Sequence, residues 1–454
     1  MPIRDWWIPL YLFACLVLGG ASNGGFLANG VLQSLGAILI GWALWAPSAS
    51  PRDASARALA WLLIAAVLLI LLQFVPLPEA LWALPAGRTE LAAEGAAIGV
   101  DYSPLLWGLL PYEAVKSAVW LVPALALALA MLRRPDWRPQ HLAWAIVAAM
   151  VMSVILGAIQ LGQGEGSPVY FYAITNVGST VGFFANSNHL ATLLLVSLPS
   201  ISALIAYQLK VGSEEFKLPF LAMGIGLIVL ALTGIVVNGS LAGWSLAGPV
   251  LAASAMILVP RSSLRKASLI LLPLILAGGM SWMLLTDEGA QLLKLEEVQS
   301  ANGSRQQIWV TTIQAVGDHL PLGSGLGTFT EVYPRYEDPA MIQSAYINHA
   351  HNDYLELLLE LGIAGMPLFV AFLAWWTRNF VRIWLNEAAS PFAVAGAISS
   401  GTILIHSVVD YPLRTAAVSS IFALSLCLMV LPPARLLLSR DTAKGRSERP
   451  TEPA

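Results

Sequence analysis

The sequence predicts an all-α integral membrane protein with about twelve transmembrane helices and a large, partly helical periplasmic loop between helices 9 and 10. Of its 454 residues, 57% are hydrophobic and only 11% are charged, whereas soluble domains carry roughly 25% charged residues. The apolar residues recur in blocks of about twenty, the length that a helix needs to cross a hydrocarbon core of ~30 Å. The basic residues are distributed among the connections as in a multi-pass protein.

The apolar blocks define the predicted helices in chain order. They cover residues 6–20, 31–46, 58–75, 115–132, 141–161, 189–208, 218–237, 241–259, 268–285, 354–377, 391–409 and 415–432. The first block resembles a signal peptide, but it lacks a convincing small-residue cleavage site, so we expect a retained helix. The two cysteines, Cys15 and Cys427, lie inside apolar blocks and offer no metal site.

The basic residues predict the orientation. With the N-terminus placed in the cytoplasm, every inner connection is basic, and 18 of the 24 lysines and arginines lie inside. This distribution follows the positive-inside rule. It predicts a multi-pass protein of the bacterial inner membrane with both termini cytoplasmic and the long loop periplasmic. The few outer cations lie among many acids and are therefore functional candidates: Arg88, Lys116, Lys294, Arg305, Arg335 and Arg414.

We expect four parts: helices 1–9 in residues 1–285, the periplasmic loop in 286–353, helices 10–12 in 354–432, and a disordered cytoplasmic tail in 433–454. The long loop is polar without being low in complexity, and long ordered loops are usually functional. Its residues 306–316 predict an amphipathic helix, and prolines and glycines then predict a turn. The residues expected on one side of that helix are Ile308, Trp309, Thr312, Ile313 and Val316.

Five of the six histidines fall on the predicted outer side: His189, His319, His349, His351 and His406. Histidine suits acid–base chemistry near neutral pH. The densest group, His349-Ala-His351-Asn352-Asp353-Tyr354, leads directly into the tenth helix, where a rigid backbone can position a side chain at the water interface. The alternative is a set of interfacial histidines with structural hydrogen bonds. A metal site is also conceivable from a His-x-His pair, but no third ligand has suitable spacing, so we expect no metal.

Arg305 begins the predicted loop helix. An arginine there suits a phosphate or diphosphate, because its guanidinium pairs with two oxygens and stays charged. The backbone amides of a helix N-terminus would add donors. The alternative is an exposed arginine that pairs with a neighbouring acid.

Two further groups are candidates. Asn186 and Asn188 precede the sixth helix, where they either orient sugar hydroxyls or cap the helix. His406 and Asp410 are spaced i, i+4 near Arg414, so we expect them to share a helix face. Ionisable residues at membrane depth favour a function, although a structural pair is the simpler alternative.

Several function classes are excluded by what the sequence lacks. It contains no P-loop, no Rossmann glycine pattern and no Gly-x-Ser-x-Gly elbow. Nucleotide-driven chemistry and a nucleotide cofactor are therefore not expected. With a net charge of −3 and basic residues that follow topology, nucleic acid is not an expected partner.

Three motifs lie between residues 300 and 366: Ser304-Arg305-Gln-Gln-Ile-Trp309, Pro321-Leu-Gly-Ser-Gly-Leu-Gly327, and His351-Asn-Asp-Tyr-Leu-Glu-Leu-Leu-Leu-Glu-Leu-Gly362-Ile-Ala-Gly365. In this order and within a large outer loop, they resemble the O-antigen ligase family. That family also includes O-antigen polymerases and protein O-oligosaccharyltransferases. The helix layout and the segment of Asn186 and Asn188 extend the resemblance over most of the chain.

The resemblance implies a metal-independent, inverting membrane glycosyltransferase that needs no cofactor. Such enzymes take a glycan from undecaprenyl diphosphate at the periplasmic face and pass it to a lipid-anchored or glycan acceptor. His351 matches the family's catalytic histidine, and Arg305 matches an arginine that engages the lipid diphosphate. The remaining residues that we expect to bind substrate are Asn186, Asn188, Arg335, His349, Asp353, Tyr354, His406, Asp410 and Arg414.

One departure from the family pattern concerns the donor site. Relatives often carry a Ser-Arg-Gly motif at the outer start of a helix, where this chain reads Asn238-Gly-Ser240-Leu241-Ala-Gly243. Leucine thus replaces the expected arginine. Either another outer cation such as Arg414, Arg335 or Arg88 substitutes for it, or the donor is bound differently.

The predicted function is therefore that of an O-antigen ligase, which transfers a polysaccharide to lipid A–core. A polymerase that joins undecaprenyl-linked repeat units is the close alternative. A lipid-linked glycan transporter is a more distant one, because the predicted helices lack ionisable residues in their middles and show no repeated halves. The glycosyl-transfer prediction requires His351 and Arg305 to converge over an opening that lipids can reach.

Overall fold

The computed structural model describes residues 6–22, 24–45, 53–100, 103–133, 137–259, 262–285, 305–339, 342 and 347–430. The predicted cytoplasmic tail and residues 286–304 of the predicted periplasmic loop lie outside the described residues. Within the described ranges the chain is helical, and β-structure is limited to the isolated bridges Gly20–Phe184 and Pro76–Leu106.

Helices overlap all twelve apolar segments of the sequence. Their bounds are α1 Trp7–Leu18, α2 Phe26–Trp45, α3 Ala54–Leu72, α6 Pro111–Trp120, α7 Val122–Arg133, α8 Pro139–Gln163, α9 Ser187–Val211, α10 Glu214–Asn238, α11 Leu241–Leu258, α12 Ser262–Leu285, α16 Asp353–Leu385, α17 Pro391–His406 and α18 Ala416–Leu428. Among the described residues, seven helices are long and apolar enough to cross a membrane, and the pair α6–α7, bent by 46°, makes up to eight. The count of about twelve spans stays a prediction.

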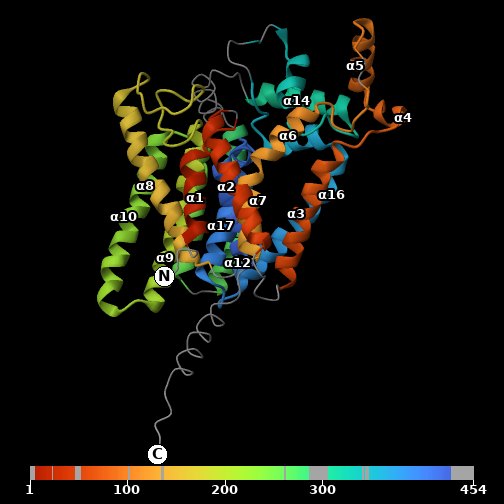
Figure 1. Cartoon of the computed structure of the whole chain (residues 1–454). Helices are drawn as coiled ribbons and strands as arrows, with labels where there is room; N and C mark the ends of the chain where they lie inside the picture. The colour runs from red at the N-terminus through yellow and green to blue at the C-terminus, as the bar shows by residue number, and fades with distance from the viewer. Residues whose placement is uncertain are drawn as a thin grey trace, which may run out of the picture.

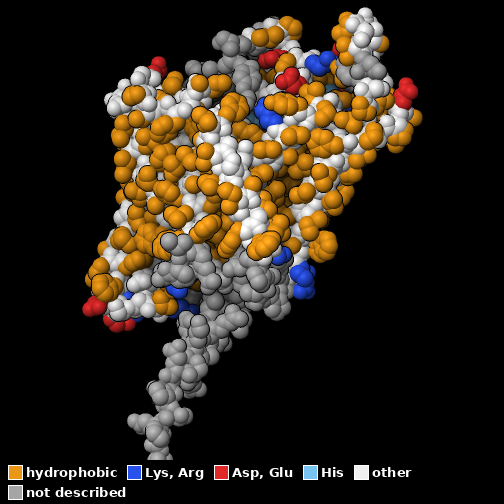
Figure 2. Space-filling model, in the orientation of Figure 1, with side chains coloured by type: hydrophobic (Ala, Val, Ile, Leu, Met, Phe, Trp, Pro, Cys, Tyr) orange, Lys and Arg blue, Asp and Glu red, His pale blue; other side chains and the backbone are white. Residues whose placement is uncertain are grey.

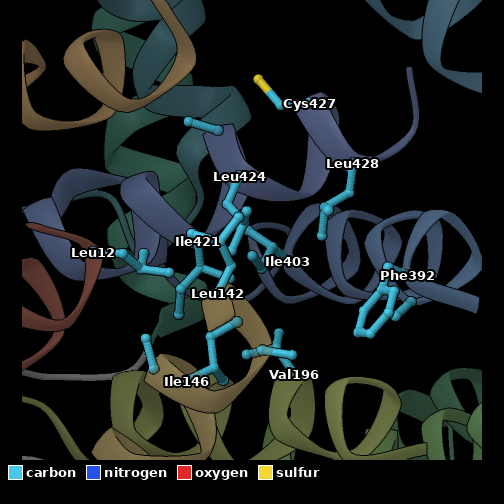
Figure 3. Packing of buried hydrophobic residues seen from close by; sticks show 14 of the residues in the cluster. Leu12, Leu142, Ile146, Val196, Phe392, Ile403, Ile421, Leu424, Cys427 and Leu428 are labelled. Carbon is cyan, nitrogen blue, oxygen red and sulfur yellow. The ribbon is translucent and has the colours of Figure 1, made fainter. Parts of the chain in front are cut away.

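The core forms around α9, which packs against α8, α10, α11 and α17. Figure 3 shows how side chains from several helices meet there, among them Leu142 and Ile146 of α8, Val196 of α9 and Ile403 of α17. Serine and threonine side chains inside α9 bind its own backbone, as Ser200 Oγ does by donating to Val196 O at 2.9 Å. Their polar groups are thus satisfied inside the apolar bundle.

The outer surface of the bundle is apolar. On the face drawn in Figure 2, hydrophobic side chains cover a broad middle band, and charged side chains lie near its two ends. Exposed residues such as Trp61, Leu218 and Ile270 belong to helices that flank the core. Soluble monomers rarely expose an apolar surface of this extent, and contact with lipid accounts for it.

One end of the bundle carries the additional short elements, and we call it the site end (Figure 1). It holds α4 (Glu79–Trp82), α5 (Ala86–Ala97), α14 (Arg305–His319), α15 (Phe329–Val332) and the 3₁₀ turn η2 (Tyr333–Arg335). The predicted loop helix is confirmed as α14, but its predicted face is partly wrong. Ile308, Thr312 and Val316 are buried, whereas Ile313 is 59% exposed, because the buried side turns toward Thr311 and Ala315.

The long helix α16 is broken at Gly362, whose φ of 56° and ψ of −150° are not helical. The predicted turn that ends at Gly327 fills the break. Ser324 N donates to Leu359 O at 2.9 Å, Gly325 N donates to Glu360 O at 2.9 Å, and Ile363 N donates to the carbonyl of Pro321 at 2.9 Å. The backbone groups freed by the break are thereby paired, as non-helical backbone at a membrane surface requires.

Candidate active site

His351 lies at the mouth of α16, directly before the N-cap residue Asn352, whose side chain accepts from Tyr354 N and Leu355 N. Its φ is 49°, and it is the one non-glycine residue with positive φ in the described ranges. Backbone strain of this kind costs about 1–3 kcal/mol and persists where the surroundings enforce it, which is common at functional sites. The strained conformation thus distinguishes His351 from the other histidines.

The imidazole of His351 faces the buried carboxylate of Asp410, with 3.4 Å between Nδ1 and Oδ1. Burial alone would raise the pKa of Asp410. The hydrogen bond and charge of His351, together with the charges of His189 and Arg305, outweigh burial, so the pKa of Asp410 lies well below its usual value. With an ionised carboxylate beside Nδ1, the neutral ring carries its proton there, and Nε2 remains to accept another. This arrangement is suited to a general base.

The helix α17 ends at His406, so Asp410 lies just beyond it, where its backbone N donates to His406 O at 3.0 Å. In the same connection, Tyr411 N donates to Oδ1 of Asp410 at 2.8 Å. The Nδ1 of His406 lies 2.8 Å from Thr192 Oγ1 of α9. His406 is thus held in the bundle interior, and Asp410 reaches His351.

Tyr411 forms an aromatic centre for the outer histidines. Its ring centroid lies 4.2 Å from that of His349, 4.9 Å from that of His351 and 5.1 Å from that of His189. The amide nitrogen of Asn186 donates to the Tyr411 hydroxyl at 3.5 Å. The segments of Asn186, His351 and Asp410, which are far apart in the sequence, therefore meet at one tyrosine.

Arg305 is the first residue of α14, one turn before Trp309. The indole Nε1 of Trp309 donates to the backbone carbonyl of His351 at 3.3 Å, and the charge of Arg305 contributes to the lowered pKa of Asp410. Because residues at i and i+4 share a helix face, α14 presents Arg305 on the side that contacts His351. The charge of Arg305 thus acts on Asp410, the carboxylate that His351 faces.

Arg414 lies in the 3₁₀ turn η4 (Pro412–Arg414) and faces three buried carboxylates. Its Nη1 is 3.0 Å from Glu360 Oε2 and 3.5 Å from Glu356 Oε1, and its Nε is 3.6 Å from Asp353 Oδ1. Burial lowers the pKa of Arg414, but these carboxylates outweigh burial and raise it. A role of Arg414 in binding the glycan donor stays a prediction. The N–H groups of its guanidinium face the three carboxylates.

The other predicted substrate ligands occupy varied positions at the site end. Tyr354 donates its hydroxyl to Leu404 O at 2.5 Å, and the Asn188 side chain accepts from Ser240 Oγ at 2.6 Å. Arg335 pairs with Glu94 of α5 at 2.7 Å, near the protein surface. Arg88 is buried and donates to Trp107 O at 2.6 Å and to Gly323 O at 2.7 Å, so its guanidinium holds the loop that fills the α16 break.

An apolar groove lies beside His351, between α14 and the part of α16 around its break. It has a volume of about 370 Å³. Its lining includes Trp309, which donates to the His351 carbonyl, and Asn352, which follows His351 in the chain. Its apolar lining comes mainly from Ile313, Leu355, Leu358, Met366 and Phe369. The groove therefore places hydrocarbon-like surface next to the polar groups of the site.

A family model described as O-antigen ligase matches residues 226–370. This part of the chain is therefore similar to the O-antigen ligase family. We call residues 226–370 the ligase region, and they include α14, the turn that ends at Gly327, His351 and the broken part of α16. No curated protein matches the chain. Together with the long apolar helices, the family assignment indicates an integral membrane protein.

The site extends beyond the ligase region, because Asn186, Asp410, Tyr411 and Arg414 come from other parts of the chain. In the described ranges, no three histidine, cysteine, aspartate or glutamate side chains are grouped as a metal ion requires.

Three residues of the site were not predicted from the sequence: Glu356, Glu360 and Tyr411. A signal for the two glutamates was present, since Asp353, Glu356 and Glu360 follow at i, i+3 and i+7 on an apolar helix. Such acids in an apolar helix favour a common buried partner. No local pattern identified Tyr411, because its ring contacts come from the distant residues His189, His349 and His351.

The departure from the family pattern at Leu241 lies at the edge of the same site. Ser240 caps α11 by accepting from Gly243 N at 3.0 Å, and it donates to Asn188. Asn238 donates to Thr180 O at 2.7 Å and to Ser187 O at 3.1 Å. Leu241 therefore begins its helix next to the segment that carries Asn186 and Asn188.

Proposed function

We propose that this protein is an inverting, metal-independent glycosyltransferase of the O-antigen ligase type. It transfers a glycan from undecaprenyl diphosphate to lipid A–core, with the site end facing the periplasm and both termini in the cytoplasm. The observation that carries the proposal is the His351–Asp410 pair, which lies against α14 and beside the apolar groove.

The proposed reaction is a direct displacement at the anomeric carbon of the donor. The acceptor oxygen bonds to that carbon while the bond from the carbon to the diphosphate oxygen breaks, and the electron pair leaves with undecaprenyl diphosphate. The acceptor's proton passes to Nε2 of His351. Asp410 orients the ring through Nδ1 and stabilises the imidazolium that forms, as carboxylates do beside other catalytic histidines.

In this proposal the two parts of the donor bind to different groups: the diphosphate to a cation and the lipid chain to an apolar surface. Arg305 pairs with the diphosphate, whose negative charge grows as the bond breaks. The first isoprene units of the lipid lie in the groove lined by Leu355, Leu358 and Phe369. Arg335, His349, Tyr354 and the asparagine segment would then contact the sugars.

The test is a transfer assay in proteoliposomes that contain the purified protein, an undecaprenyl-diphosphate-linked glycan and lipid A–core. His351→Ala should reduce the rate by about 10²–10⁴-fold, since that is the usual contribution of a general base. Arg305→Ala should lower it by a comparable factor. His141→Ala and Arg57→Ala, at the end of the bundle away from the site, are matched controls and should retain activity. Wild-type rates for His351→Ala or Arg305→Ala would disprove the assignment.

A deletion strain distinguishes ligase from polymerase. Loss of a ligase leaves long glycans on undecaprenyl diphosphate, because assembly continues without transfer. Loss of a polymerase leaves single repeat units. We expect long chains, and accumulation of single units would assign the protein to the polymerase branch.

A further inference from the structure

Glu356 lies one turn into α16, is buried, and has both carboxylate oxygens committed to residues near His351. Its Oε2 accepts from Ala350 N at 2.9 Å. Its Oε1 lies 2.8 Å from Nδ1 of His349. These two partners are the residues that directly precede His351 in the chain.

The backbone of His351 needs such a support, because its φ of 49° is unfavourable for a side-chain-bearing residue. On the C-terminal side, Asn352 caps α16, and Trp309 binds the His351 carbonyl. On the N-terminal side, the contacts of Glu356 provide the corresponding support. The carboxylate of Glu356 thus helps to hold the chain in the turn that aims the imidazole at Asp410.

A buried carboxylate is costly unless it is paired, and Arg414 supplies the pairing charge at 3.5 Å from Oε1 of Glu356. The same guanidinium binds Glu360, whose Oε1 accepts from Gly327 N at 2.8 Å. The loop that fills the α16 break and the turn before His351 are therefore tied to one arginine.

We propose that Glu356 is a positioning residue for His351. It sets the backbone before His351 by reaching both Ala350 N and His349 Nδ1, and it acts through the length of its side chain more than through its charge. Arg414 neutralises this support and does not contact the donor. The inference rests on the proposed function, because it assumes that His351 acts on the acceptor.

Two substitutions of Glu356 separate the effect of its side-chain length from the effect of its charge. Glu356→Gln keeps the length: one side-chain atom can still accept from Ala350 N, and the amide can donate to Nδ1 of His349. Glu356→Asp keeps the charge but withdraws the carboxylate by one methylene group, so both contacts lengthen. If reach positions His351, Glu356→Gln retains a kcat within about fivefold of wild type. A displacement of about 1 Å at a reacting group can cost about 10²-fold in rate, so Glu356→Asp should lower kcat by tenfold or more.

The measurements are kcat and KM for transfer in proteoliposomes, together with the thermal midpoint of each variant in detergent. We expect the loss in kcat with KM for the donor unchanged within about twofold. A role of the charge would reverse the order, with Glu356→Asp more active than Glu356→Gln, and this order would overturn the proposal. Equal wild-type activity in both variants would also overturn it.

His351→Ala, measured in the same assay, distinguishes this failure from failure of the proposed function. If His351→Ala is inactive while Glu356→Asp matches wild type, only the positioning role is wrong. If His351→Ala transfers glycan normally, the proposed function fails and the positioning role falls with it. His349→Ala removes one of the two contacts and should give a kcat between those of Glu356→Gln and Glu356→Asp.

Discussion

The break in α16 gives a sharp prediction for Gly362→Ala. Gly362 has a φ of 56° and a ψ of −150°, a combination that is essentially restricted to glycine. A Cβ atom there would lie 2.4 Å from Pro321 O and 2.5 Å from Gly323 N. Both contacts are with backbone, which cannot rotate away as a flexible side chain would.

The size of the effect follows from these contacts. The forbidden dihedral angles cost about 1–3 kcal/mol, and forcing an extra carbon into packed surroundings costs about another 1–3 kcal/mol. The expected loss in free energy of unfolding is therefore about 2–6 kcal/mol. Because the contact with Pro321 is about 1 Å short of ordinary van der Waals distance, the helix and the loop must separate by a similar amount. The turn before His351 is linked to this loop through Glu356, Arg414 and Glu360, so a shift of about 1 Å passed on to His351 would correspond to about 10²-fold in rate.

The assay combines thermal unfolding in detergent with transfer in proteoliposomes. Gly226→Ala in α10 is a matched control, because nothing lies within 4 Å of its added Cβ, and alanine favours a helix by about 1 kcal/mol over glycine. It should keep full activity and an equal or higher thermal midpoint. If Gly362→Ala unfolds and transfers like wild type, the break does not position the site and the reasoning is refuted.

Three further variants test other contacts. Asp410→Asn should lower transfer by about 10²-fold or more because His351 loses the carboxylate that orients it, and a rate within threefold of wild type would contradict this role. Since the pKa of Asp410 is depressed in the folded state, its ionised form stabilises the fold above about pH 4. This contribution is lost as the pH falls through the folded pKa, so the difference in thermal midpoint between wild type and Asp410→Asn should shrink in that acid range. Arg88→Met should lower the free energy of unfolding by about 2–4 kcal/mol, because the buried carbonyl of Gly323 and the partly buried carbonyl of Trp107 lose their donor. An unchanged midpoint in detergent would argue against that role. Leu358→Trp should fill the groove and raise KM for the lipid-linked donor with little change in kcat, so an unchanged KM would remove the groove from the donor site.

The sequence predicted the helices because hydrophobic length is a local property. Every apolar block contains a helix, yet the ends differ where tertiary contacts decide them: α2 begins at Phe26 and not at residue 31, and α16 continues to Leu385. The bend between α6 and α7 and the helix α5 were not predicted. The break at Gly362 was also missed, because its cause is the loop residue Pro321 and its neighbours, some forty residues away in the chain.

For the candidate site, residue type and motif identified several of the side chains, but not which side chains contact one another. His351 and Arg305 were selected by type, motif and position, and the structure brings their helix ends together. Helical spacing related Asp410 to His406, whose backbone carbonyl it does contact, but spacing could not reveal that the Asp410 carboxylate faces His351 beyond the end of α17. Tyr411 had no local signal, since its role depends on three histidines from two distant segments.

The leucine at position 241 bears on where the donor phosphates bind. Arg414 was one candidate to replace the missing arginine, but it already faces three carboxylates within 3.6 Å. A diphosphate brought there would have to compete with these carboxylates for the guanidinium. Arg305 begins α14, the helix that borders the apolar groove. On the proposed function, we therefore expect Arg305, and not Arg414, to bind the donor diphosphate.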